Sequence, residues 1–142
     1  MDDSIKFFTV DEANSALPLV RKVVEDIIDS YSEWCDRVEK FDLEGCTART
    51  VDQQKHSEAR AAVEEVAGRI NGYIAELHQI GCVLKGFDDG LVDFHSMLDG
   101  KHVFLCWKFG EECVSHWHEL DGGYAGRQPL TPELVERNGS AP

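Results

Sequence analysis

The sequence predicts an α+β fold, in which a long antiparallel helical hairpin with a short N-terminal helix packs on a small antiparallel β-meander of three or four strands. Up to residue 80 the apolar residues recur in steps of three and four, and beyond it they alternate with polar residues. The first spacing is typical of paired helices and the second of strands. We divide the single domain, residues 1–142, into a helical part (about 7–81), the meander (82–120) and a glycine-rich loop with a polar tail (121–142).

The composition limits the class of partner. A chain of 142 residues with 42% hydrophobic and 29% charged residues has the size and balance of one compact domain. Its net charge of −13 opposes binding to nucleic acid and to anionic membrane surfaces, because both carry negative charge. No apolar run approaches the roughly 20 residues that cross a bilayer. We therefore expect neither nucleic acid nor a membrane as a partner.

The five cysteines indicate a reducing compartment. Their number is odd, they are scattered, and no pair has the C-x-x-C spacing. The start of the chain, MDDSIKFFTVDEA, lacks the basic and apolar regions of an export signal. We therefore expect a cytoplasmic protein with free thiols rather than a disulfide or zinc-ribbon framework.

Capping signals and periodicity define the helices. The stretch TVDE at 9–12 is a capping box, and Pro18 predicts a short first helix with a kink or restart near Leu17. Two heptad-like stretches then follow, separated by a polar break and closed by Gly81, which we expect to end the second helix. The apolar positions are Val20, Val24, Ile27, Tyr31, Trp34, Val38 and Phe41 in the first, and Ala59, Val63, Val66, Ile70, Tyr73, Leu77 and Ile80 in the second.

Turn residues predict the strand register. Asp99-Gly100 is a strong hairpin signal, and Gly110-Glu111 marks a second turn. Two-residue turns at both places put Asp93 opposite Cys106, Leu105 opposite His116 and Val103 opposite His118. The histidines then share a face with Val92, Phe94 and Trp107, although a slip of one residue would reverse the faces. We expect a further strand in CVLKGF, and we expect the end of the polar C-terminal stretch PLTPELVERNGSAP to be loose.

The helices are longer than the strands, which predicts a homodimer. Helices of about 25 to 30 residues extend roughly 40 Å, whereas strands of this length extend about 20 to 25 Å. The hairpin must therefore project beyond the sheet. Its apolar residues there, including Trp34, Val38 and Phe41, predict association with a second hairpin in a four-helix arrangement.

The stretch HWH is a candidate metal site. His116 and His118 are alternate residues of a predicted strand, so they can offer two imidazoles to zinc or another transition metal. A third ligand would come from His78 or Glu76 on a covering helix, or from the following loop. The alternative is two hydrogen-bonded histidines near a sheet edge, with no metal.

Cys106 is the centre of a second candidate site. Its predicted neighbours are Asp93, opposite it, and His95, diagonal to it, which would bring a thiol, a carboxylate and an imidazole together. The alternative is that Cys106 is a small buried hydrophobic residue of a central strand.

The loop DGGYAGRQPL is the third candidate. Glycines allow close approach of a ligand to the backbone, and the guanidinium of Arg127 matches a carboxylate or phosphate. The alternative is an internal ion pair of Arg127 with Asp93, Glu111 or Glu119. Lys85 can join either arrangement.

Five motifs in order resemble a known family. FTVDEANSALPLVR, GLVDF, LCWKFGE, WHELDGG and GRQPL are together similar to the bacterial family known as domain of unknown function 2203, over about residues 7–130. The resemblance implies a small bacterial cytosolic protein and names no activity. This chain departs from the family pattern at His95, where proline is usual, and at His116, where an aromatic residue is usual. It matches the pattern at Lys85, Asp93, Cys106, Trp107, Glu111, Trp117, His118, Gly126 and Arg127.

Three functions remain open at this point. The first is a homodimeric binding protein with a small-anion site near His118 and Arg127. The second is an enzyme with His118 as general acid or base and Arg127 orienting an anionic substrate. The third is a transition-metal protein using His116 and His118. The candidate residues are His118, Asp93 and Glu111 for catalysis, and Arg127, Lys85, Gly126, Trp107 and Trp117 for ligand binding.

Overall fold

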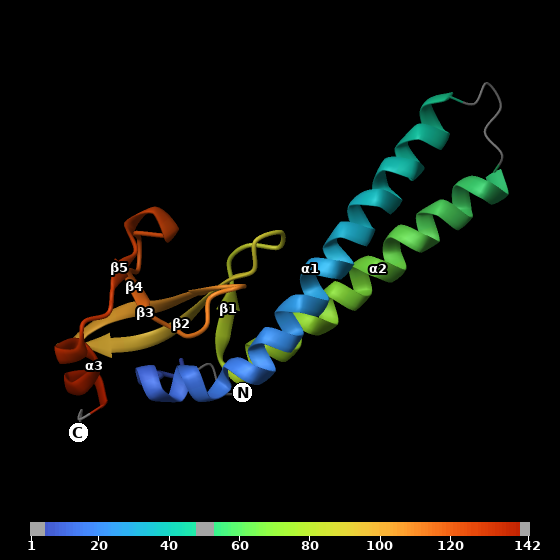
Figure 1. Cartoon of the computed structure of the whole chain (residues 1–142). Coiled ribbons are helices and arrows are strands. Elements are labelled where there is room, and N and C mark those ends of the chain that lie inside the picture. Colours follow the sequence, from blue (N-terminus) through green and yellow to red (C-terminus); the bar gives the residue numbers. More distant parts are fainter. Residues whose placement is uncertain (1–4, 48–52, 140–142) are drawn as a thin grey trace.

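The computed structural model describes residues 5–47 and 53–139 and has the predicted α+β architecture (Figure 1). The predicted polar break, DLEGCTARTVDQ at 42–53, is shorter than expected, because the first long helix continues to Thr47 and the second begins at Gln53. The middle of this break, residues 48–52, and the last residues, 140–142, lie outside the described ranges. Two long helices form the hairpin, and an antiparallel sheet of strand order β1-β2-β3-β4-β5 follows. The elements are α1 (Val10–Thr47), α2 (Gln53–Ile80), β1 (Cys82–Leu84), β2 (Leu91–Leu98), β3 (Lys101–Lys108), β4 (His116–Glu119), the 3-10 turn η1 (Tyr124–Gly126), β5 (Gln128–Pro129) and α3 (Pro132–Gly139).

The first helix begins at the predicted capping box. The Thr9 amide donates to Glu12 Oε1 at 2.8 Å, and the Glu12 amide donates to Thr9 Oγ1 at 3.1 Å. The predicted separate first helix is wrong, because α1 continues through Pro18. A proline removes one backbone hydrogen bond, but burial of Ala13, Leu17 and Val20 against the sheet holds the turns on both sides of it. Figure 1 shows α1 changing direction near its N-terminal end.

The hairpin projects beyond the sheet as predicted (Figure 1). At 1.5 Å per residue α1 is about 57 Å long, whereas an eight-residue strand covers about 27 Å. In the projecting part, the two helices meet through the rings of Phe41 and His56, whose centroids are 4.4 Å apart, and through the ion pair of Glu33 with Arg69 at 3.0 Å. Within the described ranges, no helix combines the length and apolar character of a membrane span.

The core lies between the hairpin and one face of the sheet. The first half of α1 and the end of α2 bury Val20, Val24, Ile27 and Leu77 against this face. Helix α2 ends at Ile80, where predicted, and the Gly81 amide donates to the Leu77 carbonyl at 3.0 Å. The sheet contributes Cys82, Val92, Phe94, Leu105 and Trp107.

The β2–β3 hairpin has the predicted register. Asp99 and Gly100 have φ angles of 53° and 78°, which a tight hairpin turn requires and which glycine adopts without strain. Leu98 therefore pairs with Lys101, and Asp93 with Cys106.

The predicted register of β4 is wrong by one residue. His118 pairs with Phe104 and His116 with Cys106, instead of with Val103 and Leu105. Residues 109–115 form a longer connection than a two-residue turn, and it is anchored to α1 by the Val114 amide, which donates to Asn14 Oδ1 at 2.7 Å. Both histidines therefore lie on the face that the hairpin does not cover, opposite the one predicted.

The C-terminal segment is more ordered than predicted. Residues 128–129 add a fifth strand to the three or four predicted, and α3 forms over Pro132–Gly139 within the stretch predicted as a polar tail. The Thr131 hydroxyl caps α3 by accepting from the Leu134 amide at 3.2 Å. The buried Asn138 side chain accepts from the Val10 amide at 2.6 Å and donates to Ser96 Oγ and the Met97 carbonyl. This one amide ties α3 to both α1 and β2.

Replacing Asn138 should destabilise the fold strongly. Asn138→Ala leaves the Val10 amide and two acceptors without their partner in a buried place, which costs about 1–3 kcal/mol or more. Arg137→Ala is the matched control on the same helix, because it removes an exposed, solvent-screened ion pair with Asp99, for which we expect a much smaller loss. Urea unfolding measures both values, and equal losses would contradict the role given to Asn138.

Candidate functional site

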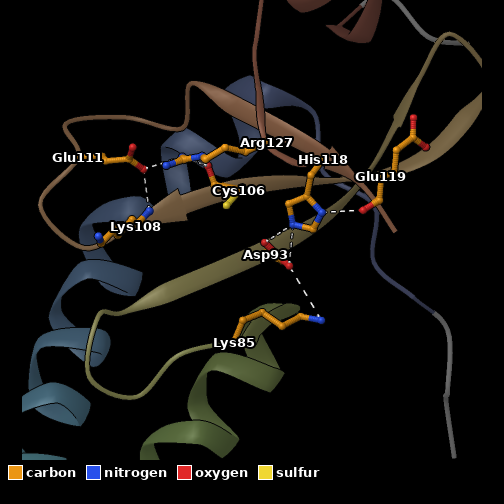
Figure 2. A network of polar contacts seen from close by, with 8 residues as sticks. All are labelled: Lys85, Asp93, Cys106, Lys108, Glu111, His118, Glu119 and Arg127. Carbon is orange, nitrogen blue, oxygen red and sulfur yellow. Dashed lines mark hydrogen bonds and ion pairs between the residues drawn. The ribbon is translucent and has the colours of Figure 1, made fainter. Parts of the chain in front are cut away.

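The site is built on the sheet face that the hairpin leaves uncovered. The register of β2, β3 and β4 places Asp93, Cys106 and His118 on this face, and the His118 ring reaches across β3 to Asp93 (Figure 2). All three side chains are buried, and one ligand-type atom from each lies within 4.8 Å of the others.

Both ring nitrogens of His118 face acceptors. Nδ1 lies 2.6 Å from the Glu119 carbonyl oxygen, and Nε2 lies 3.0 and 3.1 Å from the two carboxylate oxygens of Asp93. A carbonyl can only accept, so Nδ1 carries a proton and donates it. A second proton must then lie between Nε2 and the Asp93 carboxylate. Asp93 and His118 thus form a proton-sharing pair, and His118 has no ring nitrogen left to contact a substrate.

Cys106 and Lys85 flank this pair. Burial, followed by the negative charge of Asp93, raises the pKa of the Cys106 thiol to about 12, so the group is a neutral thiol. The Lys85 ammonium lies 4.0 Å from Asp93 Oδ2 and 4.9 Å from the Phe104 ring centroid. The Lys85 side chain is 45% exposed, whereas that of Asp93 is 4% exposed. The site therefore joins a buried acid–imidazole pair to an accessible cation.

Arg127 forms the internal ion pair that the sequence left as an alternative. Its Nη2 donates to Glu111 Oε1 at 3.0 Å and to the Cys106 carbonyl at 3.3 Å, and the side chain is only 12% exposed. Burial raises the pKa of Glu111, but hydrogen bonds from Arg127 and from the Lys108 amide outweigh it, so this pKa lies below the usual 4.5. Arg127 thus fixes the β3–β4 connection and does not face the pocket.

A pocket of about 310 Å³ opens above the Asp93–His118 pair. The strands and Lys85 form one side, and the loop after β4 forms the other. Gly123 in this loop has a φ of 62°, which favours glycine. The lining residues are Lys85, Leu91, Asp93, Cys106, His118, Leu120, Asp121, Gly123 and Tyr124.

The other residues singled out in the sequence do not line the pocket. Trp107 and Trp117 lie on the face turned to the hairpin, where they pack with the core, so they are separated from the pocket. Gly126 lies in η1, and a side chain at that position would meet no atom within 4 Å. His116 Nδ1 lies 2.9 Å from Ser115 Oγ, outside the group of three.

The histidine beside Asp93 and Cys106 is His118 and not the predicted His95. His95 lies on the expected face, but its Nδ1 is 2.9 Å from His102 Nε2, and Phe7 packs its ring edge against both imidazoles. Burial, then His102 and Lys85, lower the pKa of His95. His118 takes the place beside Asp93 that the sequence assigned to His95, because β4 is shifted by one residue. Asp121 and Tyr124 belong to the candidate loop DGGYAGRQPL but were not singled out in it, and Leu91 and Leu120 were not predicted, since nothing in their spacing distinguishes them from ordinary strand-end residues.

The comparisons with known proteins give a family and no activity. A family model described as "Uncharacterized conserved protein (DUF2203)" matches residues 6–130, which is most of the chain. No curated protein and no solved structure matches it. The matched range contains every residue of the pocket and of the Arg127–Glu111 pair.

Glu111 should give the fold a dependence on pH. Because its pKa in the folded state is lowered, its carboxylate stabilises the fold fully above pH 4.5, and this contribution is lost as the pH falls through the folded-state pKa. Urea unfolding between about pH 6 and pH 3 should show a smaller loss of stability for Glu111→Gln than for the unmodified chain. Equal losses in the two proteins would contradict a carboxylate held ionised by Arg127.

Proposed function

Because the chain belongs to the uncharacterised conserved family DUF2203, whose description names no activity, we propose a function from the site itself: the protein binds a small anionic molecule in the pocket above Asp93 and His118. The observation that carries this proposal is an accessible lysine at a pocket whose buried charged groups, Asp93 and His118, are already paired with each other. Lys85 takes the anion-binding role that the sequence gave to Arg127.

The charges around the pocket indicate the ligand. The proton that Asp93 and His118 share makes the pair neutral as a unit, so the Lys85 ammonium is the local positive charge. At 4.0 Å its contact with Asp93 is too long for a hydrogen bond, so the ammonium can donate to a ligand. Asp121 lines the same pocket and can accept from a hydroxyl or amino group. The ligand we propose therefore carries one carboxylate or phosphate and one hydrogen-bond donor.

The size of the pocket agrees with this ligand class. A volume of about 310 Å³ lies at the lower end of small-molecule sites, roughly 300–1,000 Å³. The side chains of Leu91, Leu120 and Tyr124 give it apolar walls around the few polar groups. The enzyme alternative with His118 as general acid or base has less support, because both of its ring nitrogens are engaged.

We further propose that the projecting hairpin binds a second copy of the chain. A groove on α1, about 380 Å³ in volume, is mostly apolar and has acidic side chains at its edge, and it lies beyond the part of α1 that packs on the sheet. Its lining residues are Trp34, Cys35, Val38, Glu39, Asp42 and Leu43. Another surface of the same hairpin gathers Arg37, Lys40 and Lys55. Two antiparallel hairpins can thus bury the apolar grooves and match acidic with basic residues.

The proposal includes a cytoplasmic location and the absence of a nucleic-acid partner. The net charge of −13 supports a protein without a nucleic-acid partner. Free thiols at Cys35, Cys82, Cys106 and Cys113 suit the reducing cytoplasm.

Lys85→Met should weaken binding of the anionic ligand. Loss of a charge-assisted hydrogen bond, about 1.5–3 kcal/mol, reduces the affinity roughly tenfold or more. Titration of the full chain with inorganic phosphate and with small hydroxycarboxylates, followed by amide NMR, should shift the Gly123 and Tyr124 signals. Lys22→Met, which removes an exposed lysine on α1, is the control and should bind normally. Unchanged affinity in Lys85→Met would contradict the proposed site.

Light scattering tests the dimer. We expect twice the 15.9 kDa of one chain at micromolar concentration. Val38→Asp puts a charge into the α1 groove and should return the mass of a single chain, whereas Ala61→Asp, at an exposed position of α2, should leave the dimer intact. A single-chain mass for the unmodified protein would refute the dimer.

A further inference from the structure

The Asp93–Cys106–His118 group has the composition of a metal site. It offers one carboxylate oxygen, one sulfur and one imidazole nitrogen, all within 4.8 Å of one another (Figure 2). Among the described residues this is the one group of three such side chains that lies so close together. The three residues stand on three adjacent strands of one sheet, so the backbone sets their spacing.

The distances suit an ion of the zinc class. Bonds of about 2.0–2.3 Å in a tetrahedral site separate the ligand atoms by roughly 3.3–3.7 Å. His118 Nε2 and Asp93 Oδ1 are already 3.0 Å apart, and since all three ligand atoms lie within 4.8 Å of one another, no separation has to close by more than about 1 Å. Side-chain rotation supplies such a change without moving the strands. A mixed sulfur, nitrogen and oxygen set favours zinc or cobalt over magnesium or calcium, which take oxygen ligands.

The second nitrogen of His118 is held as it is in metal-bound histidines. Its Nδ1 donates to the Glu119 carbonyl at 2.6 Å, which fixes the orientation of the ring and turns Nε2 towards Asp93 and Cys106. Such a hydrogen bond to a carbonyl is the usual support of an imidazole ligand. His116 lacks this arrangement, because its Nδ1 lies beside Ser115 Oγ and its ring is outside the group.

We propose that Asp93, Cys106 and His118 bind one transition-metal ion of the zinc class, with its fourth coordination position open to the pocket. The proposal deepens the proposed function, and in that respect rests on it, because the anionic group of the ligand would occupy the fourth position beside Lys85. Three protein ligands and one exchangeable position are the arrangement of metal sites that act on a bound molecule.

The exchange of protons balances the charge of the ion. Cys106 gives up its thiol proton, and the proton shared by His118 and Asp93 also leaves, both to solvent. Without metal, Asp93 is a negative carboxylate, Cys106 is a neutral thiol, and the shared proton makes the His118 imidazole cationic. With a divalent ion it has a carboxylate, a thiolate and a neutral imidazole, so the net charge of the group stays at zero. The high thiol pKa set by burial and Asp93 does not oppose this, because a bound divalent cation reverses the local field.

Cobalt titration of the chelator-treated full chain tests the site. Co²⁺ should bind with one equivalent and produce a near-ultraviolet thiolate-to-cobalt absorption band. Cys106→Ser should abolish this band and lower the affinity for zinc, measured by competition with a chromophoric chelator, on the order of 100-fold. Cys113→Ser, which removes an exposed thiol, is the matched control and should keep both. Circular dichroism establishes that each variant is folded.

The two histidines of β4 separate this site from the pair predicted by the sequence. His118→Gln should lose cobalt binding, whereas His116→Gln should keep it. Because His118 is buried, Cys106→Ser carries the test if His118→Gln does not fold. Absence of the thiolate band in the unmodified chain, or its persistence in Cys106→Ser, would overturn the proposal.

Lys85→Met distinguishes the metal site from the anion site. Removal of a positive charge next to the ion should tighten zinc binding about three- to tenfold, whereas it weakens binding of a phosphate or carboxylate. A thiolate–cobalt band without any phosphate or carboxylate shift at Gly123 would retain the metal site and reject the anionic ligand. Phosphate binding that depends on Lys85, in a chain that gives no cobalt band, would reject the metal site alone.

Discussion

The pairing of β4 with β3 is the constraint on which the site depends. With His118 opposite Phe104, the imidazole reaches Asp93 and Cys106 on the open face of the sheet. A shift of one residue would turn His118 towards the hairpin and Trp117 towards the pocket, because neighbouring residues of a strand point to opposite faces. Two contacts around the strand oppose such a shift: the Val114 amide bonds Asn14, and the Leu130 amide bonds the Ser115 carbonyl. The position of His118 is therefore set by bonds that it does not itself make.

The two faces of the sheet are covered in different ways, and this explains where polar groups can be buried. The helices give one face an apolar core. Trp107 is fully buried there, and its indole N–H donates to the Glu111 carbonyl. On the other face, the loop after β4 lies over the Asp93–His118 pair, and Phe7 packs against His95 and His102. A buried carboxylate is tolerated there because His118 supplies a shared proton and Lys85 lies nearby. Loss of one partner would leave the other as an unpaired buried group, which costs more free energy than formation of the pair gains. Each partner therefore keeps the other in place.

The sequence predicted the features that depend on local signals. The capping box at Thr9, the end of α2 before Gly81 and the Asp99-Gly100 turn each depend on a few neighbouring residues, and the pairing of Asp93 with Cys106 follows from that turn. The length of the β3–β4 connection was predicted wrongly, because it is set by contacts with Asn14 and Arg127, which lie far from it in the sequence. Helix α3 was missed for a similar reason, since its polar sequence is held by Asn138, which bonds α1 and β2.

Arg127 shows how a residue outside the pocket can still shape it. Its guanidinium bonds Glu111 and the Cys106 carbonyl on one side, and on the other its central carbon lies 4.8 Å from the centroid of the Tyr124 ring. Tyr124 forms part of the pocket wall, and the Arg127 amide also bonds the Tyr124 carbonyl. A cation over an aromatic face contributes about 0.5–1 kcal/mol at exposed places and more when shielded from water. The lone loop arginine of an acidic chain thus holds the wall against the strands, and Lys85 is left as the cation that a ligand can reach.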